Sequence, residues 1–320
     1  MAFKYRGLEV RGDLKEMITE TPMDVTNLIG SRVLPEIGVR QTGGTIAVMP
    51  AGTAHRPTST ERADGGAYSR STFNLTEDSF TTKVFGAEEG VDLISKIATS
   101  DILDEETVAA TIARNRLLLS REKRVADAIM NTTTFTGAKY TGAVGTAWDD
   151  SAADFRSDIR DAGSILRERL GVDLSGLSLI LTMDRVRDMV ETLAGLDSIK
   201  YTQTIDLQSD SGRVSALKQF IGVKEIITGD AMGNSAGLGL DSKFEFLWAN
   251  DKAMLTLLSP ATQSWKLGGL GRQPVFSKLT NDYIMESYDQ ESHDMRWVRA
   301  KEQRGEKVFK DFGYLLTGLV

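Results

Sequence analysis

One stretch of the sequence, residues 104–131, most constrains the fold because it predicts a single long helix. Its interior is rich in Ala, Leu, Arg, Glu and Lys, which are strong helix formers, and it contains no Gly or Pro. Asp104 is placed to cap the first turn, and Glu105 and Glu106 bring negative charge to the positive end of the helix dipole. At 1.5 Å per residue the helix is roughly 40 Å long, well beyond the average of globular proteins. We therefore expect the rest of the chain to be organised around it.

The two faces of this helix differ in character. Apolar residues recur at helical spacing and form one stripe, widened by two further residues. The stripe consists of Val108, Ile112, Leu119, Ala126 and Ile129, with Leu118 and Val125 beside it. The opposite face carries five cations, Arg114, Arg116, Arg121, Lys123 and Arg124. The pattern predicts an amphipathic core helix whose charged face meets solvent.

Composition excludes several classes of function. The chain has 320 residues, which fits one large domain or two smaller ones. Its formal net charge of -7 argues against a protein that wraps nucleic acid, which needs a dense positive surface. The charge is compatible with a protein that lies near DNA without binding it tightly. Because the sequence has no cysteine, disulfides, thiolate zinc sites and cysteine nucleophiles are excluded. No signal-peptide pattern and no 18-residue apolar run occurs, so we expect a soluble protein made in a cytoplasm.

The residues before the long helix predict an extended hairpin. A short helix is expected over residues 8–19, and strands over residues 45–49 and 73–85. Between these strands, residues 51–71 are polar, rich in Gly and without periodicity. Two interpretations stay open: a disordered linker, or an arm that becomes ordered by lying on another subunit, since a lone two-stranded hairpin is marginally stable in water.

The residues around and after the long helix predict a compact α/β unit followed by a β-rich end. Helices are expected over residues 91–97, 154–170 and 183–194, and the second of these has Gly171 as its C-terminal stop. Strands are expected over residues 177–182, 223–229, 244–249, 254–258, 283–288, 295–300 and 308–316. Residues 289–294 are expected to be the tip of a hairpin.

One motif suggests a serine hydrolase. Residues 233–237 satisfy the pattern G-x-S-x-G around Ser235, and Asp251 or Asp282 and then His293 follow in the chain order of an α/β-hydrolase triad. A nucleophile elbow requires a strand before the serine and a helix after it. The residues that follow Ser235 are Ala-Gly-Leu-Gly-Leu-Asp, which is poor helix material. We therefore predict that Ser235 is not a nucleophile.

No other cluster predicts a catalytic, cofactor or metal site. His55 and His293 each lie in a polar stretch, which favours solvated surface residues. The acidic groups at residues 104–106 and 149–150 are expected to cap helices or turns rather than to bind a divalent ion. The glycine-rich run at residues 268–272 lacks the Lys-Ser/Thr ending of a phosphate loop and is expected to be a turn. The chain is thus predicted not to be an enzyme and to carry no cofactor.

The order of these parts resembles the major capsid protein of tailed bacteriophages, whose fold is shared with encapsulin shells. The local likenesses lie in residues 177–193, 217–237, 244–260 and 307–320. The resemblance implies an α+β chain with the phage major-capsid fold: an N-terminal arm, an extended β-hairpin loop, a peripheral domain with a long spine helix, and an α/β axial domain. It implies an arm over residues 1–39, an extended loop over 40–86, a peripheral domain over 87–149 and 250–305, and an axial domain over 150–249 and 306–320.

The resemblance also implies a function. It is self-assembly, through pentamers and hexamers, into the icosahedral head shell of a virion that encloses double-stranded DNA without sequence-specific binding. Assembly is expected in the host cytoplasm and away from membranes. Only about forty residues precede the hairpin, so scaffolding would be a separate protein or absent, and portal or decoration proteins are further possible partners. Some family members cross-link a loop lysine to an asparagine. In this sequence Lys83 is the candidate lysine, and Asn281 or Asn250 is the candidate asparagine. The alternatives are an encapsulin-like nanocompartment shell and a serine hydrolase that uses Ser235.

Overall fold

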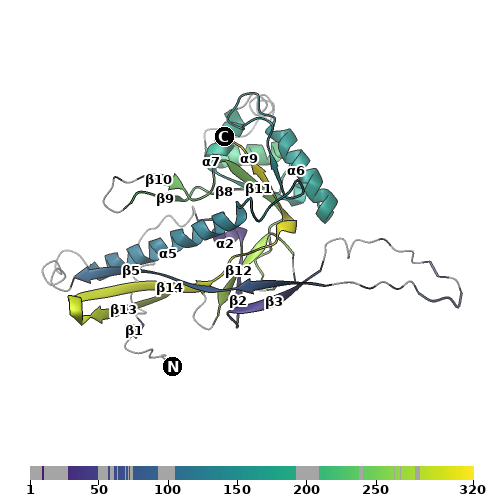
Figure 1. The fold of residues 1–320 in the computed structure, drawn as a ribbon. Helices are drawn as coiled ribbons and strands as arrows, with labels where there is room; N and C mark the ends of the chain where they lie inside the picture. Colours follow the sequence, from purple (N-terminus) through teal and green to yellow (C-terminus); the bar gives the residue numbers. More distant parts are fainter. Residues whose placement is uncertain are drawn as a thin grey trace.

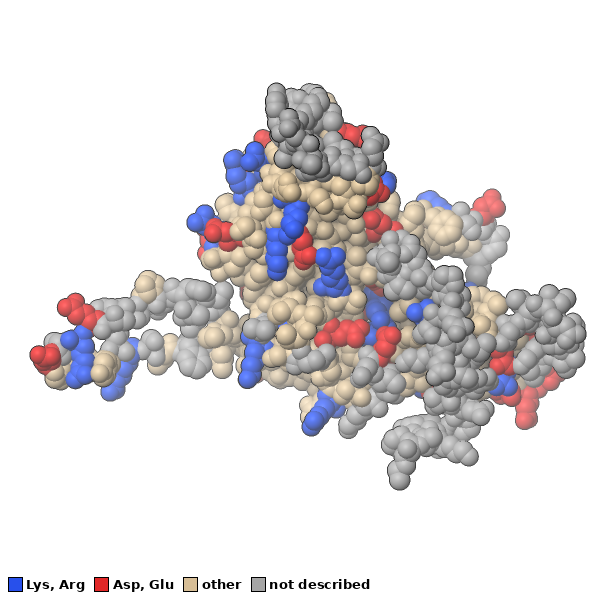
Figure 2. Space-filling model, turned by 180° about the vertical axis from the view of Figure 1, so that it is seen from behind, with Lys and Arg blue, Asp and Glu red and all other residues tan. Residues whose placement is uncertain are grey.

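The computed structural model describes residues 9–10, 28–49, 57, 61–62, 64–68, 70, 72, 75–92, 105–191, 209–237, 241, 243–262, 264–266, 268–277 and 282–320. These residues form an α+β chain built on two larger sheets, with the long helix between them (Figure 1). None of the helices in this part of the chain is both long and apolar enough to cross a membrane. On the face seen in Figure 2, acidic and basic side chains lie interspersed over the described surface.

The predicted long helix is confirmed as α5, Glu105–Ile129. Its C-terminal half buries Leu118, Val125, Ala126 and Ile129, as the stripe predicts. In its N-terminal half the stripe is wrong, because Val108 and Ile112 are 39% and 37% exposed. The buried residues there are instead Ala109, Ala110, Ala113 and Leu117, which pack in one cluster with residues of the sheet beneath. Alanine has a small side chain, so this register lets the helix lie close to the strands.

The sheet beneath α5 is mostly antiparallel and contains the longest strands of the described residues. Its central strand β14 pairs along its full length with β5 and over seven residues with β13. The predicted hairpin tip at residues 289–294 is confirmed, with the short helix η3 (Glu291–His293) between β13 and β14. The strands are β1 (Glu9–Val10), β2 (Glu36–Val39), β5 (Lys83–Asp92), β12 (Gly271–Phe276), β13 (Ile284–Gln290), β14 (Met295–Arg304) and β15 (Lys307–Val308).

The second large sheet has five strands in the order β6-β16-β11-β7-β8. The predicted helix over residues 154–170 is confirmed as α6, with Asp154 accepting a hydrogen bond from Ser157 N and Gly171 at a φ of 68° closing the helix. The strands are β6 (Thr141–Ala143), β7 (Ser178–Leu181), β8 (Glu225–Thr228), β11 (Lys252–Thr256) and β16 (Gly313–Thr317). The helices are α6 (Phe155–Leu170), α7 (Met183–Glu191) and α9 (Asp210–Ile221), and their apolar faces form one core with the sheet.

Two smaller hairpins project from this body in opposite directions (Figure 1). One consists of β3 (Gly43–Val48) and β4 (Thr76–Thr81), which pair antiparallel as predicted. The single strand predicted over residues 73–85 is wrong in its extent, because the chain leaves this pairing after Thr82 and residues 83–85 belong to β5. Most of the predicted tip over residues 51–71 lies outside the described residues. The other consists of β9 (Met232–Asn234) and β10 (Phe244–Phe246).

Several predicted elements differ from the structure. The helix predicted over residues 91–97 is wrong at its start, because Val91 is the buried penultimate residue of β5; residues 93–97 lie outside the described part. The helix predicted over residues 8–19 is wrong at Glu9–Val10, which pair with β13 as a strand, and residues 11–19 also lie outside the described part. Strand β12 was not predicted, because it contains Pro274, which cannot donate a backbone hydrogen bond.

The division into peripheral and axial domains stays a prediction, but the sheet pairing bears on two of its segments. The predicted boundaries assign residues 141–143 and 252–256 to the peripheral domain. In the structure these residues are β6 and β11, and both pair with β16 in the five-stranded sheet. Their side-by-side placement with β7 and β8 comes from long-range pairing, which sequence order does not reveal.

Candidate assembly surface

The β3–β4 hairpin is fixed to the body at its base. The Phe80 ring stacks on Trp265 with 5.5 Å between ring centroids, and Trp265 meets Phe309 edge to face at 6.5 Å. Lys307 Nζ lies 2.5 Å from Asp78 Oδ1. The chain passes from β4 into β5 at Thr82, whose N–H donates to Thr42 O at 2.7 Å. These contacts join the hairpin to the β12–β15 region and set the direction in which it leaves the body.

Beyond this base the two strands of the hairpin bury little surface against the rest of the described chain. Strand β4 has no buried residue, and Ile46 is the buried residue of β3. Met49 and Leu75, at the outer ends of the two strands, are exposed apolar side chains. A two-stranded sheet with one buried residue is marginally stable in water, so such an extension is suited to contact with a neighbouring molecule.

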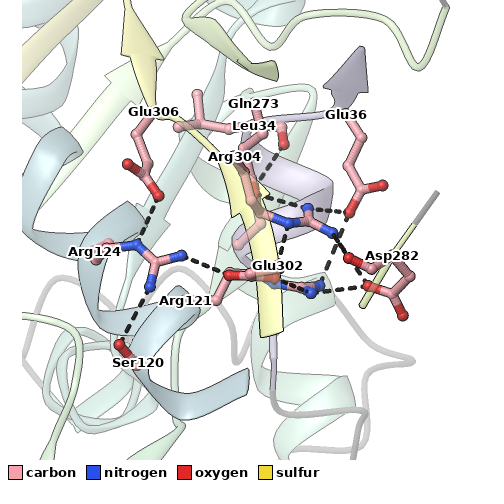
Figure 3. A network of polar contacts seen from close by, with 11 residues as sticks. Leu34, Glu36, Ser120, Arg121, Arg124, Gln273, Asp282, Glu302, Arg304 and Glu306 are labelled. Atoms are coloured by element: carbon pink, nitrogen blue, oxygen red, sulfur yellow. Dashed lines mark hydrogen bonds and ion pairs between the residues drawn. The ribbon is translucent and has the colours of Figure 1, made fainter. Parts of the chain in front are cut away.

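A cluster of buried charges joins α5 to the long sheet at the root of the same hairpin (Figure 3). Its centre is Glu302 on β14, whose side chain is fully buried. Glu302 Oε2 accepts hydrogen bonds from Arg121 Nη2 at 2.5 Å and Nε at 2.9 Å, and Oε1 accepts from Arg124 Nη2 at 2.7 Å. Arg304 Nε forms a third ion pair with Glu302 Oε2 at 2.9 Å. The Glu302 carboxylate thus joins strand β14, which carries it, to helix α5 through Arg121 and Arg124. Arg304, also on β14, is its third partner.

Further carboxylates surround these arginines. Asp282 Oδ1 lies 2.8 Å from Arg121 Nη2 and 3.1 Å from Arg304 Nη2, and Glu36 Oε1 lies 2.5 Å from Arg304 Nη1. Burial by itself would lower the pKa of Arg121, but the charges of Glu302 and Asp282 outweigh it and raise that pKa, so the guanidinium stays charged. The cluster therefore holds β2, α5 and β14 at one point, and β2 is the strand that leads into the hairpin.

This cluster corrects the prediction for the charged face of α5. Arg121 and Arg124 were expected to be solvated, yet their side chains are only 12% and 18% exposed. Arg124 also lies over the Phe85 ring at 3.6 Å. Arg116 and Lys123 are exposed, as predicted, and form ion pairs with Glu89 and Asp127.

A second buried carboxylate, Glu122 on α5, joins the N-terminal segment to the helix and to the segment between β10 and β11. Glu122 Oε1 accepts hydrogen bonds from Ile29 N (2.9 Å), Gly30 N (3.1 Å) and Trp248 Nε1 (2.7 Å), and Oε2 accepts from Gly30 N (2.9 Å). Burial raises the pKa of Glu122, although these hydrogen bonds and the charge of Arg121 act in the opposite direction. A Cβ on Gly30 would lie 2.7 Å from Glu122 Oε2, so this contact requires glycine. The carboxylate caps the short helix α2 (Gly30–Val33).

The residues that match a hydrolase triad in chain order are not brought together. Ser235 follows β9, and its N–H donates to Lys243 O at 2.8 Å, beside the antiparallel strand β10. A nucleophile elbow requires a helix after the serine, whereas the next described element here is β10, a strand antiparallel to β9. Asp282 belongs to the charge cluster, Leu319 N donates to Asp251 O at 3.1 Å, and His293 Nδ1 lies 2.8 Å from Ser292 Oγ. Among the described residues, no contact joins Ser235 to His293 or to either aspartate.

The remaining sequence candidates also lie apart. His55, Asp104 and Asn281 are outside the described residues. Glu106 forms an ion pair with Arg296 at 3.2 Å, and Asp150 caps a turn through Ala152 N. Within the described part, no group of His or acidic side chains is arranged to hold a metal ion. Asn250 accepts a hydrogen bond from Thr182 in the five-stranded sheet, whereas Lys83 begins β5 in the other sheet. A lone lysine and scattered asparagines form no motif, so the cross-link is not predicted for this chain.

Sequence reasoning missed Glu122 and Glu302 as organising residues. Each stands in a charged stretch, Arg-Glu-Lys-Arg in the helix and Lys-Glu-Gln-Arg in β14, which is typical of a solvated surface. A signal was present in β14, where Glu302 and Arg304 follow Val298 and Ala300 at the two-residue period of one strand face. Alternation of this kind places Glu302 and Arg304 on the buried face.

We compared the sequence and the structure of the chain with those of known proteins. The sequence matches no protein-family model and no curated protein. Among solved structures, the chain is similar to a phage-related protein from Bordetella bronchiseptica RB50, with a TM-score of 0.67 and 17% identity over 98% of this chain and 99% of that one. It is also similar to the virus-like particle from Pyrococcus furiosus (TM-score 0.53, 12% identity, 96% of each chain). A third similar chain forms the capsid of the cyanophage P-SCSP1u (TM-score 0.55, 9% identity, 88% of this chain and 84% of that one).

Proposed function

We propose that this chain, which has the phage major-capsid fold, is the major capsid protein that assembles into the icosahedral head of a tailed bacteriophage around its double-stranded DNA. The observation that carries the proposal is that the likeness to a phage-related protein, to a virus-like particle chain and to a phage capsid chain spans 84% or more of this chain and of each similar one.

The geometry of the candidate assembly surface supports this proposal. A shell subunit must present rigid contact surfaces to several neighbours. Here the β3–β4 hairpin extends away from the body, while the aromatic contacts at Trp265 and the charge cluster around Glu302 fix its direction. The extended part exposes apolar side chains and little of it is buried in its own subunit. A hairpin with a fixed base and an exposed apolar outer part suits an arm that lies on an adjacent copy.

We assign the parts of the chain accordingly. The N-terminal arm is residues 1–39 and the extended loop is residues 40–86. The peripheral domain is residues 87–149 and 250–305, and the axial domain is residues 150–249 and 306–320. On the basis of the sheet pairing, we move residues 141–143 and 252–256 to the axial domain.

The partners that follow are further copies of the chain, as pentamers and hexamers. Scaffolding, portal and decoration proteins are separate chains in this proposal, and the packaged DNA is contacted without sequence specificity, in keeping with a net charge of -7. The protein acts as a structural component of the virion after assembly in the host cytoplasm, and not as an enzyme. A nanocompartment shell is the second candidate, favoured by the likeness to the Pyrococcus furiosus particle.

Purified protein tests the proposal. Sedimentation velocity over a range of protein and salt concentrations, with negative-stain electron microscopy of the fast fractions, is expected to show capsomers or closed particles. A sharp monomer under all conditions, including with a phage scaffolding protein supplied, would refute the proposal. Nuclease-protected double-stranded DNA in particles from infected cells distinguishes a phage head from a nanocompartment.

A further inference from the structure

Arg272, the second residue of β12, is a buried cation for which the described chain supplies no counter-charge. It is only 1% exposed. Its Nη1 donates a hydrogen bond to Thr262 O at 2.7 Å, and its Nη2 lies 3.5 Å from Thr262 Oγ1. Burial lowers the pKa of Arg272, and no carboxylate among the described residues opposes this effect. Because arginine keeps its proton in proteins, the positive charge remains at this buried position.

The other arginines that are buried in the described chain, Arg304 and Arg185, have acidic partners. Arg304 forms ion pairs with three carboxylates, and Arg185 forms one with Asp188 at 2.9 Å. Burying a charge is costly unless the charge is paired. In place of such partners, Arg272 has the neutral oxygen atoms of Thr262. This difference points to an anion from outside the chain.

A second cation lies beside Arg272. Lys307 on β15 is its direct cross-strand partner, and directly opposed residues of antiparallel strands share one face of the sheet. Like charges in such positions are destabilising. Asp78 of the β3–β4 hairpin neutralises one of the two cations through its contact with Lys307 Nζ at 2.5 Å. One positive charge is therefore in excess on this face.

The segment between β11 and β12 packs on the same face and adds a neutral donor. Thr262 contacts Arg272, and Trp265 meets Phe309, two residues beyond Lys307. The Thr262 hydroxyl can donate a hydrogen bond to an oxygen of an anion. A guanidinium group offers two parallel N–H groups, an arrangement that matches two oxygens of a phosphate. The donors that converge here are thus two cations and one hydroxyl, which suits an oxyanion.

We infer that Arg272, Lys307 and the Thr262 hydroxyl bind a small oxyanion of the phosphate or sulfate class at the root of the β3–β4 hairpin. On binding, the guanidinium group exchanges Thr262 O for two oxygens of the ion. The ion is small, because Arg272 is buried too deeply for the backbone phosphates of DNA to reach it. The inference goes beyond the proposed function, since a single subunit forms the site. Trp265, which stacks on Phe80 of the hairpin, lies in the same segment as Thr262, so the ion stabilises the base of the hairpin.

Urea unfolding of the free subunit in sodium phosphate, compared with sodium chloride of equal ionic strength, tests the inference. Phosphate stabilises folded proteins in general, so the response must be compared between variants. Arg272→Met removes the buried charge, and Arg116→Met removes an exposed arginine as a matched control. The unfolding midpoint is expected to rise saturably with phosphate in the wild type and in Arg116→Met, and this saturable rise is expected to be lost in Arg272→Met. Arg272→Lys, which keeps the charge but loses the fork of donors, is expected to bind phosphate on the order of tenfold more weakly.

Stability in chloride alone gives a second readout. Arg272→Met is expected to be at least as stable as the wild type there, because an apolar side chain avoids the cost of a buried unpaired charge. A marked loss of stability would show that Thr262 satisfies the guanidinium group, and it would overturn the inference. An equal response of the wild type and Arg272→Met to phosphate, or no response beyond that to chloride, also overturns it. A DNA duplex that stabilises the wild type but not Arg272→Met would assign the site to nucleic acid instead of a small ion.

Discussion

Replacing Glu302 by glutamine removes the charge at the centre of the buried cluster and changes little else. The side chain keeps its size, but Arg121, Arg124 and Arg304 lose the carboxylate that all three contact within 2.9 Å. Breaking a buried ion pair by removing one partner costs about 3–5 kcal/mol, because the remaining charge stays buried. Asp282 and Glu36 still face two of these arginines and offset part of the loss. We therefore expect the free energy of unfolding to fall by about 3 kcal/mol, the lower end of that range.

Glu89→Gln is the matched control. Glu89 also pairs with an arginine of α5, Arg116, but the side chains are 27% and 55% exposed. Exposed ion pairs contribute roughly 0.2–1 kcal/mol. Urea unfolding of the free subunit, followed by circular dichroism, measures both variants, and an unchanged slope with denaturant confirms that stability alone has changed. A loss for Glu302→Gln no larger than that for Glu89→Gln would refute the argument that the buried carboxylate holds the helix to the sheet.

Three further predictions concern other parts of the chain. Glu122→Ala leaves three buried donors without an acceptor, and at about 1–3 kcal/mol for each unsatisfied group it should lower the free energy of unfolding by at least about 3 kcal/mol in the same urea assay. Burial raises the pKa of Glu122, so its contribution to stability is full below its unfolded pKa of about 4.3 and declines as pH rises through the folded value. Glu122→Gln should remove that decline, and an identical pH profile for both proteins would contradict the assignment. Ser235→Ala should change stability by less than about 0.5 kcal/mol and leave assembly intact, whereas labelling of Ser235 by a fluorophosphonate probe would show that it is a nucleophile. Replacing residues 52–67 by a short Gly-Ser link should leave unfolding of the free subunit nearly unchanged and make assembly fail or become irregular; normal shells would show that the segment is a passive linker.

Local signals predicted the elements that depend on neighbouring residues. The long helix was predicted within two residues at each end, because its composition and the acidic first turn are local properties. Helix α6 was predicted equally well, since Asp154 and Gly171 determine its ends through contacts within one turn. The strands on either side of residues 289–294 were predicted from alternation and from the polar tip between them.

Properties that depend on distant residues were not predicted. The burial of Ala109 and Ala113 in place of Val108 and Ile112 depends on how closely β5 and β14 approach the helix, and hydrophobicity alone favours the larger side chains. The burial of Arg121 likewise requires Glu302, which lies 181 residues away. Strand β12 pairs in parallel with β2 across more than two hundred residues, and its proline argues locally against a strand.

The contacts that hold the N-terminal segment also determine when it can take its place during synthesis. Arg304 reaches Glu36 across 268 residues of sequence, and Gln273 Nε2 donates to Gly30 O across 243. At a synthesis rate of about 5–20 residues per second, the ribosome needs roughly 13–54 s after Glu36 to reach Arg304. The segment that carries the β3–β4 hairpin therefore cannot be fully fixed to the body until Arg304 has been made and released. A nascent chain that ends before Arg304 accordingly lacks a correctly directed hairpin.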